Sequence, residues 1–527
     1  MISISDLTVR IHDRPVLRDV AMTLAPGRIM GLVGESGSGK SMTALAIMGL
    51  LPQGGQADGQ VMLDGQNLLT MTEDQLCAIR GRRIGMIFQE PMTALNPLMN
   101  IGDQVAEVLR IHQRLPRQQA LARARARLDR VGLPAPRFPL TLYPHQLSGG
   151  QRQRVAIALA IAEAPDLLIA DEPTTALDVT TQAQILDLLR DLVRDEGMSL
   201  LLITHDLAVV AGTADDVAVM KHGEIVEEGP TEALFRRQSH PYTRALFAAS
   251  RHAPDPVPVA AGPQPILSVQ DAVRDYALAR PSFFAPYPLL RAVDHVSLQI
   301  GAGESVGLVG ESGCGKSTLT RAILGLEGLQ HGQILLDGQP VLPGRAMNGA
   351  LRAKVQVVFQ DPFGSFDPRW RVDRLLAEPF HLTGRPPDWR DRVAQALTEV
   401  GIEADAGRRF IHEFSGGQRQ RLAIARALII RPRLIVLDEA VSALDVRVRA
   451  QVLDLLAGLR RSHGMAYLFI SHDLGVVRGV TDRVLVMDRG RIVETGPTAQ
   501  VMDAPQHPTT QRLMQAMPEI PEEWSVT

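Results

Sequence analysis

The most constraining feature of this sequence is an internal duplication. Five short segments of the first half return in the second half in the same order. They are GESGSGKS at 34–41 and GESGCGKS at 310–317, FQEP at 88–91 and FQDP at 359–362, SGGQRQR at 148–154 and 415–421, ADEPTTALD at 170–178 and LDEAVSALD at 437–445, and ITHDL at 203–207 and ISHDL at 470–474. The spacing is also kept, because Glu172 lies 24 positions after Ser148 and Glu439 lies 24 positions after Ser415. Repetition of both order and spacing predicts two copies of one fold.

The two copies meet at a proline-rich segment. Residues 251–265, RHAPDPVPVAAGPQP, contain five prolines, which remove backbone donors and disfavour both helix and sheet. We therefore predict an exposed, extended linker between a first domain at 1–250 and a second domain at 266–527. A chain of 527 residues is too long for one ordinary core and suits two large domains.

Composition narrows the classes of function. A formal net charge of -3 gives no general support for nucleic-acid binding, so no nucleic-acid partner is expected. The two cysteines, Cys77 and Cys314, lie in different halves, which argues against a disulfide framework and against a zinc or iron–sulfur site. The N-terminus does not read as a secretory signal, and no run reaches the ~18–20 apolar residues of a membrane-spanning helix. We expect a cytosolic protein that reaches a membrane only through partners.

In each copy a short apolar run leads through a glycine-rich turn into a helical pattern. The turns match G-x-x-x-x-G-K-S, in which backbone N–H groups wrap a triphosphate at the positive end of the following helix. The lysine of this pattern reaches the β and γ phosphates, and the serine binds Mg²⁺. The predicted ATP-binding residues of the two turns are Gly34, Glu35, Ser36, Gly37, Ser38, Gly39, Lys40 and Ser41, and Gly310, Glu311, Ser312, Gly313, Cys314, Gly315, Lys316 and Ser317.

Two apolar runs end in a pair of acids. LLIADE ends in Asp171 and Glu172, and LIVLDE ends in Asp438 and Glu439. An aspartate at a strand end can hold Mg²⁺ through water, and the adjacent glutamate can polarise the attacking water. The alternative, a helix cap at a strand-to-helix turn, leaves the upstream phosphate loops without a purpose. We therefore predict the glutamates as catalytic residues and the aspartates as part of the Mg²⁺ sites.

Together these segments resemble the ATP-binding cassette (ABC) ATPases across nearly the whole chain, in two tandem copies. The most specific sign is LSGGQRQR at 147–154 and FSGGQRQR at 414–421, which other phosphate-loop ATPases lack. The resemblance implies an α/β fold, in which each cassette has a RecA-like phosphate-loop core, an antiparallel β subdomain and a helical subdomain. It also implies that these segments face the γ-phosphate bound by the opposite cassette, rather than acting only as helix caps. The residues concerned are Ser148, Gly149, Gly150, Gln151, Ser415, Gly416, Gly417 and Gln418.

The same resemblance implies roles for three further pairs of residues. They are Gln89 and Gln360, in a loop that senses Mg²⁺ and connects to the transporter partner; His205 and His472, which contact the γ-phosphate; and Asp178 and Asp445, which communicate across the paired cassettes. Each ATP site is then composite. One site combines Lys40, Glu172 and His205 with Ser415, and the other combines Lys316, Glu439 and His472 with Ser148.

The two copies depart from each other in two places. Tyr276 can stack on adenine in the second copy, whereas Ile11 stands at the corresponding place in the first, so we expect weaker adenine contact there. Ala440 and Val441 replace the Pro-Thr pair that follows the first glutamate, which changes backbone stiffness but removes no catalytic group. Both sites are predicted to hydrolyse ATP.

The glutamine loops and the tails indicate the kind of cassette protein. QEPMTALNP at 89–97 and QDPFGSFDP at 360–368 resemble the ATPases of dipeptide, oligopeptide, glutathione and nickel importers, as do the tails at 240–249 and 507–516. The resemblance implies a peripheral ATPase on the cytoplasmic face of the bacterial inner membrane that energises peptide uptake. Its implied partners are two membrane permeases and an extracytoplasmic solute-binding protein. Some members hold an iron–sulfur centre in the tail, but neither cysteine lies in a tail here.

Other readings stay open at this point. Nickel or glutathione import is an alternative, because the ATPase does not touch the solute. Tandem cassettes that act on ribosomes have a long, charged, helical connector, unlike the short segment at 251–265. The arginine-rich stretch at 121–130 is either a solvated helical face or a docking surface for an acidic partner.

Overall fold

The computed structural model describes residues 2–89, 94–175, 177–255, 264–278, 280, 287–361, 364–442 and 444–524. The central part of the proline-rich linker and part of each glutamine loop, at 90–93 and 362–363, lie outside these ranges. Both halves adopt the α/β cassette fold that the sequence predicts. No helix of the described ranges has the length and apolar character needed to cross a membrane.

The core of the first cassette is a six-stranded sheet with the order β10-β9-β3-β8-β7-β6. Its strands are β3 (Ile29–Val33), β6 (Ile84–Ile87), β7 (Leu167–Asp171), β8 (Ser199–Thr204), β9 (Asp216–Lys221) and β10 (Glu224–Pro230). All neighbours are parallel except the edge pair β9 and β10. Strands β3, β6, β7 and β8 are buried along their whole length, as parallel strands covered on both faces must be. The central strand β3 leads directly into the phosphate loop.

A second, antiparallel sheet of the first cassette has the order β2-β1-β4-β5. Its strands are β1 (Ile2–Ile11), β2 (Arg14–Leu24), β4 (Gly55–Leu63) and β5 (Gln66–Asn67). The two-residue turn between β1 and β2, His12-Asp13, has φ values of 47° and 64°, the positive pair that suits a tight hairpin. One face of this sheet packs on Met30 and Leu32 of β3, so it adjoins the phosphate loop.

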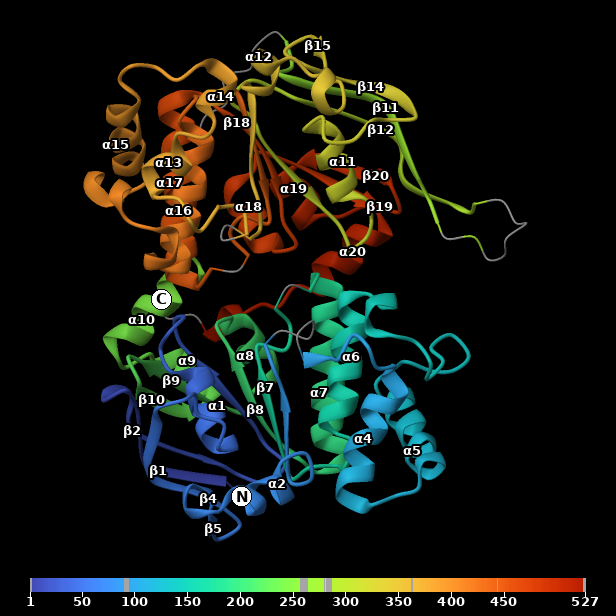
Figure 1. The fold of residues 1–527 in the computed structure, drawn as a ribbon, viewed down its shortest axis with the longest axis vertical. Helices are drawn as coiled ribbons and strands as arrows, with labels where there is room; N and C mark the ends of the chain where they lie inside the picture. Colours follow the sequence, from blue (N-terminus) through green and yellow to red (C-terminus); the bar gives the residue numbers. More distant parts are fainter. Residues whose placement is uncertain are drawn as a thin grey trace.

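Three helices of the first cassette form a helical subdomain, and the others cover the large sheet or form the tail (Figure 1). The subdomain helices are α4 (Ile101–Gln113), α5 (Arg117–Arg130) and α6 (Gly149–Ala160). The others are α1 (Lys40–Met48), α2 (Glu73–Ile79), α7 (Val179–Glu196), α8 (Leu207–Thr213), α9 (Thr231–Arg237) and α10 (Pro241–Ser250). The serine-glycine segment predicted to face ATP begins α6, so the subdomain carries it.

The second cassette repeats this architecture, with sheet orders β16-β17-β18-β13-β19-β20 and β12-β11-β14-β15. Its strands are β11 (Leu267–Ala277), β12 (Leu289–Ile300), β13 (Ser305–Val309), β14 (His331–Leu336), β15 (Gln339–Pro340), β16 (Val355–Val358), β17 (Leu434–Asp438), β18 (Ala466–Ile470), β19 (Arg483–Asp488) and β20 (Arg491–Pro497). Its helices are α11 (Lys316–Ile323), α12 (Gly349–Arg352), α13 (Val372–Leu376), α14 (Phe380–Thr383), α15 (Trp389–Glu399), α16 (Gly416–Leu428), α17 (Val446–His463), α18 (Leu474–Val480), α19 (Thr498–Asp503) and α20 (Pro508–Gln515). The two short helices α13 and α14 stand where the first cassette has α4, and Pro379 lies at the break between them.

The C-terminal tails of the two cassettes cross over (Figure 1). Helix α10, which ends the first cassette, packs against α17 of the second, and α20 packs against α7 of the first. Beyond α20, the Trp524 ring meets the Phe235 ring of the first cassette edge-on, with centroids 5.7 Å apart. His252, in the linker just after α10, has its Nε2 2.7 Å from Asp454 Oδ1 of the second cassette. Each tail therefore binds its own cassette to the opposite one.

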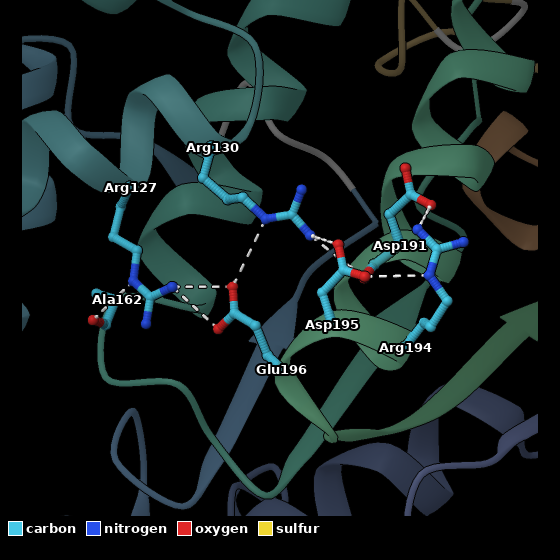
Figure 2. Close-up of polar contacts among 7 residues, drawn as sticks. All are labelled: Arg127, Arg130, Ala162, Asp191, Arg194, Asp195 and Glu196. Atoms are coloured by element: carbon cyan, nitrogen blue, oxygen red, sulfur yellow. Dashed lines mark hydrogen bonds and ion pairs between the residues drawn. The ribbon is translucent and has the colours of Figure 1, made fainter.

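The arginine-rich stretch lies in α5, and all four of its arginines have partners inside the cassette; Figure 2 shows those of Arg127 and Arg130. Arg127 Nη1 donates to both carboxylate oxygens of Glu196, each at 2.9 Å, and Arg130 Nη2 donates to Asp195 at 2.8 Å. Both acids lie at the C-terminal end of α7. These contacts anchor the helical subdomain to a helix of the core.

Candidate active sites

Each phosphate loop joins the central strand of a large sheet to the helix that follows, β3 to α1 and β13 to α11. Gly39 and Gly315, the last loop residues, have φ values of 112° and 111°, which favour glycine. A Cβ on Gly39 would lie 2.6 Å from the Leu17 side chain, and one on Gly315 would lie 2.1 Å from the Ala292 carbonyl oxygen. The second glycine of each motif is therefore required by the backbone path.

The lysines of the two loops fold back over the loop backbone and are buried. Lys40 Nζ donates to the carbonyl oxygens of Gly34 and Glu35, both at 2.9 Å. Lys316 makes the same two bonds in its own loop, at 2.7 and 3.0 Å. Burial lowers the pKa of Lys40, although nearby carboxylates, Glu172 foremost, act in the opposite direction. A buried ammonium group gains from an adjacent anion, so phosphate oxygens can replace these carbonyls as its partners.

Glu172, the predicted catalytic glutamate of the first cassette, is held by three side chains. Gln89 Nε2 donates to Glu172 Oε2 at 3.1 Å, and His205 Nδ1 lies 3.1 Å from Glu172 Oε1. The Thr175 hydroxyl donates to Oε2 at 2.9 Å. Burial by itself raises the pKa of Glu172, but the contacts with His205 and Thr175 and the charge of Lys40 outweigh it and bring the pKa to about 2. The structure thus brings together the predicted glutamate, histidine and glutamine.

Glu439, the predicted catalytic glutamate of the second cassette, has fewer side-chain partners among the described residues. His472 Nδ1 lies 3.5 Å from Glu439 Oε1, and contact with this histidine keeps the pKa of Glu439 below its ordinary value in spite of burial. In the described part of the chain, no hydrogen bond joins Gln360 to Glu439. Ser442, at the position of Thr175, donates to the Glu439 backbone oxygen at 2.9 Å instead of to its carboxylate. The same catalytic residues are present, but they are assembled more loosely.

The aspartates at the strand ends fit a divalent cation. Asp171 is 5% exposed, and its Oδ1 has no hydrogen-bond partner among the described residues. Burial raises the pKa of Asp171 and of Asp438, while a hydrogen bond with Ser41 opposes the rise at Asp171. A buried carboxylate oxygen without a partner is costly, and Mg²⁺ prefers oxygen ligands of this kind. The residues present therefore suit the predicted metal.

The serine-glycine segments form the starts of α6 and α16. Ser148 Oγ accepts from the Gln151 N–H at 3.4 Å, and Gln151 Oε1 accepts from the Ser148 N–H at 2.9 Å. Ser415 and Gln418 make the same reciprocal pair. These residues thus do cap their helices. Both serines are nevertheless exposed at a helix N-terminus, where backbone N–H groups favour an anion.

The loops after the glutamates reach across to the opposite cassette. Asp178 Oδ2 accepts from the Ser312 N–H in the second phosphate loop at 3.2 Å. Asp445 lies close enough to Lys40 to oppose the lowering of its pKa. A cavity of about 580 Å³ between the cassettes is lined by both His205 and His472. Within the described ranges, no hydrogen bond joins Ser148 or Ser415 to the opposite phosphate loop. Their predicted position facing the ATP of the opposite cassette therefore stays a prediction.

Two residues that contact the phosphate loops had no motif to reveal them. Arg447, two positions after Asp445, donates to Glu35 Oε1 of the first loop at 2.9 Å, across the cassette boundary. The hydroxyl of Tyr242, in the first tail, accepts from the Glu35 N–H at 3.2 Å. Only their positions in the sequence pointed to them: Arg447 directly follows the predicted interface loop at Asp445, and Tyr242 lies in the tail at 240–249.

Tyr276 lies beside the second phosphate loop, as predicted. Its hydroxyl lies 3.4 Å from the hydroxyl of Thr318, in the first turn of α11. Ile11 occupies the corresponding position at the end of β1. The structure thus places Tyr276 and Ile11 at matching positions of β11 and β1, and the difference in adenine contact stays a prediction.

The chain has two phosphate loops. Each lies beside an acidic strand end and is approached by the loop that follows the glutamate of the other copy. These features define a tandem phosphate-loop ATPase. Comparison with known proteins gives the family. The family model described as "ABC transporter" matches residues 17–175 and 293–442, and the model described as "Oligopeptide/dipeptide transporter, C-terminal region" matches 226–265 and 493–527. The chain belongs to the ABC transporter family and is the ATP-hydrolysing subunit of such a transporter.

Similar proteins match over almost the whole chain. Peptidoglycan transport ATP-binding protein YejF of Agrobacterium fabrum is 46% identical, covering 98% of this chain and 96% of that protein. Glutathione import ATP-binding protein GsiA of Escherichia coli is 44% identical, covering 95% of this chain and 86% of that protein. A solved cassette from Clostridium perfringens, part of an ABC transporter complex, is 29% identical and covers 46% of this chain and 91% of its own, with a TM-score of 0.40.

Proposed function

We propose that both cassettes bind Mg²⁺ and ATP and hydrolyse ATP by attack of a water molecule that Glu172 or Glu439 deprotonates. The observation that carries this proposal is the Glu172 carboxylate, which Gln89 holds on one oxygen and His205 on the other, at the end of the strand beside the phosphate loop. Water attacks the γ-phosphorus, the bond to the β-phosphate oxygen breaks, and the glutamate accepts the proton.

The remaining residues of each site bind and orient the nucleotide. Lys40 and Lys316 would bind the β and γ phosphates together with the loop N–H groups. When bound, Mg²⁺ supplies neutralisation of phosphate charge. Its binding residues would be Ser41, Asp171 and Gln89 in the first cassette and Ser317, Asp438 and Gln360 in the second.

His205 would also set the basicity of Glu172. In this structure the contact with His205 contributes to a pKa of about 2 for Glu172, which makes a weak base. Movement of His205 from the glutamate to the γ-phosphate would remove that contact and raise the pKa. The glutamate would then become a stronger base only after ATP is bound.

Each site would be completed by the opposite cassette. The contact of Asp178 with Ser312 and the proximity of Asp445 to Lys40 support this arrangement, because the loops after the glutamates already reach the opposite phosphate loops. Closure onto ATP would bring Ser415 to the first site and Ser148 to the second. Binding of ATP would close the cassettes, and hydrolysis with product release would reopen them.

Two membrane permeases would dock beside the glutamine loops. A cavity of about 690 Å³ next to Gln360 is lined by Phe359 and by Glu378 of the helical subdomain. Phe359 is 40% exposed and its counterpart Phe88 is 43% exposed, so each cassette presents an aromatic side chain beside its glutamine. Docking there would place the chain on the cytoplasmic face of a bacterial inner membrane and couple closure to alternating access.

The solute is proposed to be a di- or oligopeptide or glutathione, delivered by an extracytoplasmic binding protein. The match of both tails to the oligopeptide/dipeptide model supports this class, and so does the name of the Escherichia coli relative, a glutathione import ATP-binding protein. Nickel import stays the alternative to peptide or glutathione import, with a metal ion as the solute.

One experiment tests the whole proposal. The complex is purified from membranes, its permeases are identified, and its ATPase activity is measured with each candidate binding protein and solute. Stimulation by peptide or glutathione is expected. Stimulation by nickel alone would show that nickel, and not peptide or glutathione, is the solute. Absence of any co-purifying permease would contradict the importer role.

A further inference from the structure

Tyr276 is fixed in place by charged neighbours. Its hydroxyl donates to Glu327 Oε2 at 2.5 Å. Glu327 in turn lies 3.3 Å from Arg274 Nε and 3.5 Å from Arg321 Nη1. The Arg274 guanidinium also lies over the Tyr276 ring, 4.9 Å from its centroid. The ring is therefore held at its hydroxyl and on one face, and Tyr276 as a whole is only partly buried.

The fixed ring lies where a nucleoside would extend from the phosphate loop. Thr318, whose hydroxyl is 3.4 Å from the Tyr276 hydroxyl, comes two residues after Lys316 in the same helix turn. An aromatic face at that position can stack on a base, and stacking depends on the ring being held in orientation.

The first cassette has apolar side chains at all the corresponding positions. The N–H of Leu50 donates to the Leu45 carbonyl at 2.8 Å, and the N–H of Leu326 donates to the Arg321 carbonyl at 2.8 Å. This shared turn equates Leu45 with Arg321 and therefore Leu51 with Glu327. Met42, Leu45 and Leu51 of the first cassette pack against the apolar core beneath the small sheet. Ile11, at the end of β1, stands at the position of Tyr276, so in the described part of the first cassette neither the ring nor the charged side chains that hold it are present at the matching positions.

We propose that Glu327 is a positioning residue that holds Tyr276 as a preformed adenine platform, so that the second ATP site binds adenine nucleotides more tightly than the first. Glu327 touches neither phosphate nor the reacting water and acts only through Tyr276. The second site would retain ATP, and the first site would be the one that exchanges nucleotide. This inference rests on the proposed role of the Lys316 loop in binding the triphosphate.

The test uses the full-length chain with Lys40→Ala, which silences the first phosphate loop. Calorimetry measures binding of AMP-PNP, a non-hydrolysable ATP analogue, and of inorganic tripolyphosphate, which has no base. Glu327→Leu, which copies the first cassette, should weaken AMP-PNP binding by roughly 5- to 10-fold, a partial loss of the stacking contribution. It should leave tripolyphosphate binding unchanged.

Two further variants separate positioning from folding. Glu327→Gln can still accept the tyrosine hydroxyl and should restore most of the AMP-PNP affinity. Tyr276→Phe should weaken binding as Glu327→Leu does, and combining the two should add little, because both remove the same hydrogen bond. Additive effects, or equal loss of tripolyphosphate binding, would overturn the positioning role.

The first cassette offers a matched gain of function. In a Lys316→Ala chain, Ile11→Tyr alone should tighten AMP-PNP binding by only about twofold, whereas Ile11→Tyr with Leu51→Glu should tighten it by roughly 5-fold. Equal effects with and without the glutamate would contradict the inference.

The two kinds of ligand also keep this inference apart from the proposed function. If the Lys40→Ala chain failed to bind tripolyphosphate at all, the proposed role of the Lys316 loop would be wrong. If tripolyphosphate bound normally but AMP-PNP affinity ignored Glu327, only the platform would be refuted.

Discussion

The two cassettes differ in which of their parts is held firmly. In the first, the Glu172 carboxylate has three side-chain partners within 3.1 Å, whereas in the second Glu439 has one histidine at 3.5 Å. In the second, the Tyr276 hydroxyl is tied to Glu327, whereas the first cassette has no ring at that place. A preassembled catalytic centre and a preassembled base platform therefore lie in different cassettes.

The helical subdomains differ in the same manner. In the first cassette Arg127 donates twice to Glu196 at 2.9 Å. In the second cassette the matching helices meet through His463 Nε2 and Glu399 Oε2, 3.9 Å apart. Duplication has kept the catalytic residues while relaxing different supports in each copy.

The largest expected effect comes from removing each catalytic carboxylate. Glu172→Gln and Glu439→Gln should each lower hydrolysis at their own site on the order of 10²–10⁴-fold, because the general base is lost. Single-turnover hydrolysis, read with the other phosphate loop silenced, measures each site. A variant whose own site hydrolyses at the unmodified rate would remove that glutamate from the mechanism and break the equivalence of the two sites.

The next effect concerns the anchoring of the helical subdomains. Arg127→Ala leaves the largely buried Glu196 with only its long contact to Arg130 Nε, at 3.9 Å, and should cost about 1–3 kcal/mol of unfolding free energy. His463→Ala, the matched change in the second cassette, should cost about 0–1 kcal/mol, since its contact is long. Urea unfolding followed by circular dichroism measures both. Equal losses would show that the two subdomains are anchored alike.

A smaller effect is expected in acid. The pKa of Glu172 is about 2 in the folded chain and 4.5 ordinarily, so its stabilising contribution is complete above pH 4.5 and is lost as the pH falls toward 2. The difference in unfolding free energy between the unmodified chain and Glu172→Gln should therefore shrink over that range. Glu439→Gln should show a smaller change, because Glu439 has one partner. Identical pH profiles would contradict the difference in assembly.

The smallest effect is a difference in thiol reactivity. Cys77 is exposed, whereas Cys314 is buried in the second phosphate loop, where burial raises its pKa. A thiol-specific reagent at neutral pH should label Cys77 readily in the folded chain and Cys314 only after denaturation. Mass spectrometry of the labelled peptides measures this. Fast labelling of Cys314 would show that the second loop opens in the absence of nucleotide.

Much of this organisation could be predicted from the sequence, because its signals are local. The strand, glycine turn and helix around Lys40 follow one another directly in the chain, and the same is true around Lys316. The acids at the ends of β7 and β17 follow buried runs, so their position at the sheet edge could also be inferred. The resemblance to the ABC ATPases then implied that Glu172 and His205 share one site, and in the structure His205 Nδ1 lies 3.1 Å from Glu172 Oε1.

The contacts that could not be predicted join residues far apart in sequence without a motif. Trp524 packs on Phe235, and Arg447 pairs with Glu35, only because the tails and interface loops cross between cassettes. The arginines of α5 looked like a solvated face, because the acids that pair with Arg127 and Arg130 lie more than sixty residues later in α7. Glu327 had no motif at all, and only the structure shows it at the Tyr276 hydroxyl.

The central claim is that each ATP site needs the opposite cassette. It is tested most directly by Ser415→Arg, placed separately in Lys316→Ala chains, which report the first site, and in Lys40→Ala chains, which report the second. Single-turnover ATP hydrolysis is measured in both. The account predicts loss of hydrolysis at the first site, which belongs to the other cassette, and little change at the second. Loss at the second site with the first unaffected would contradict it.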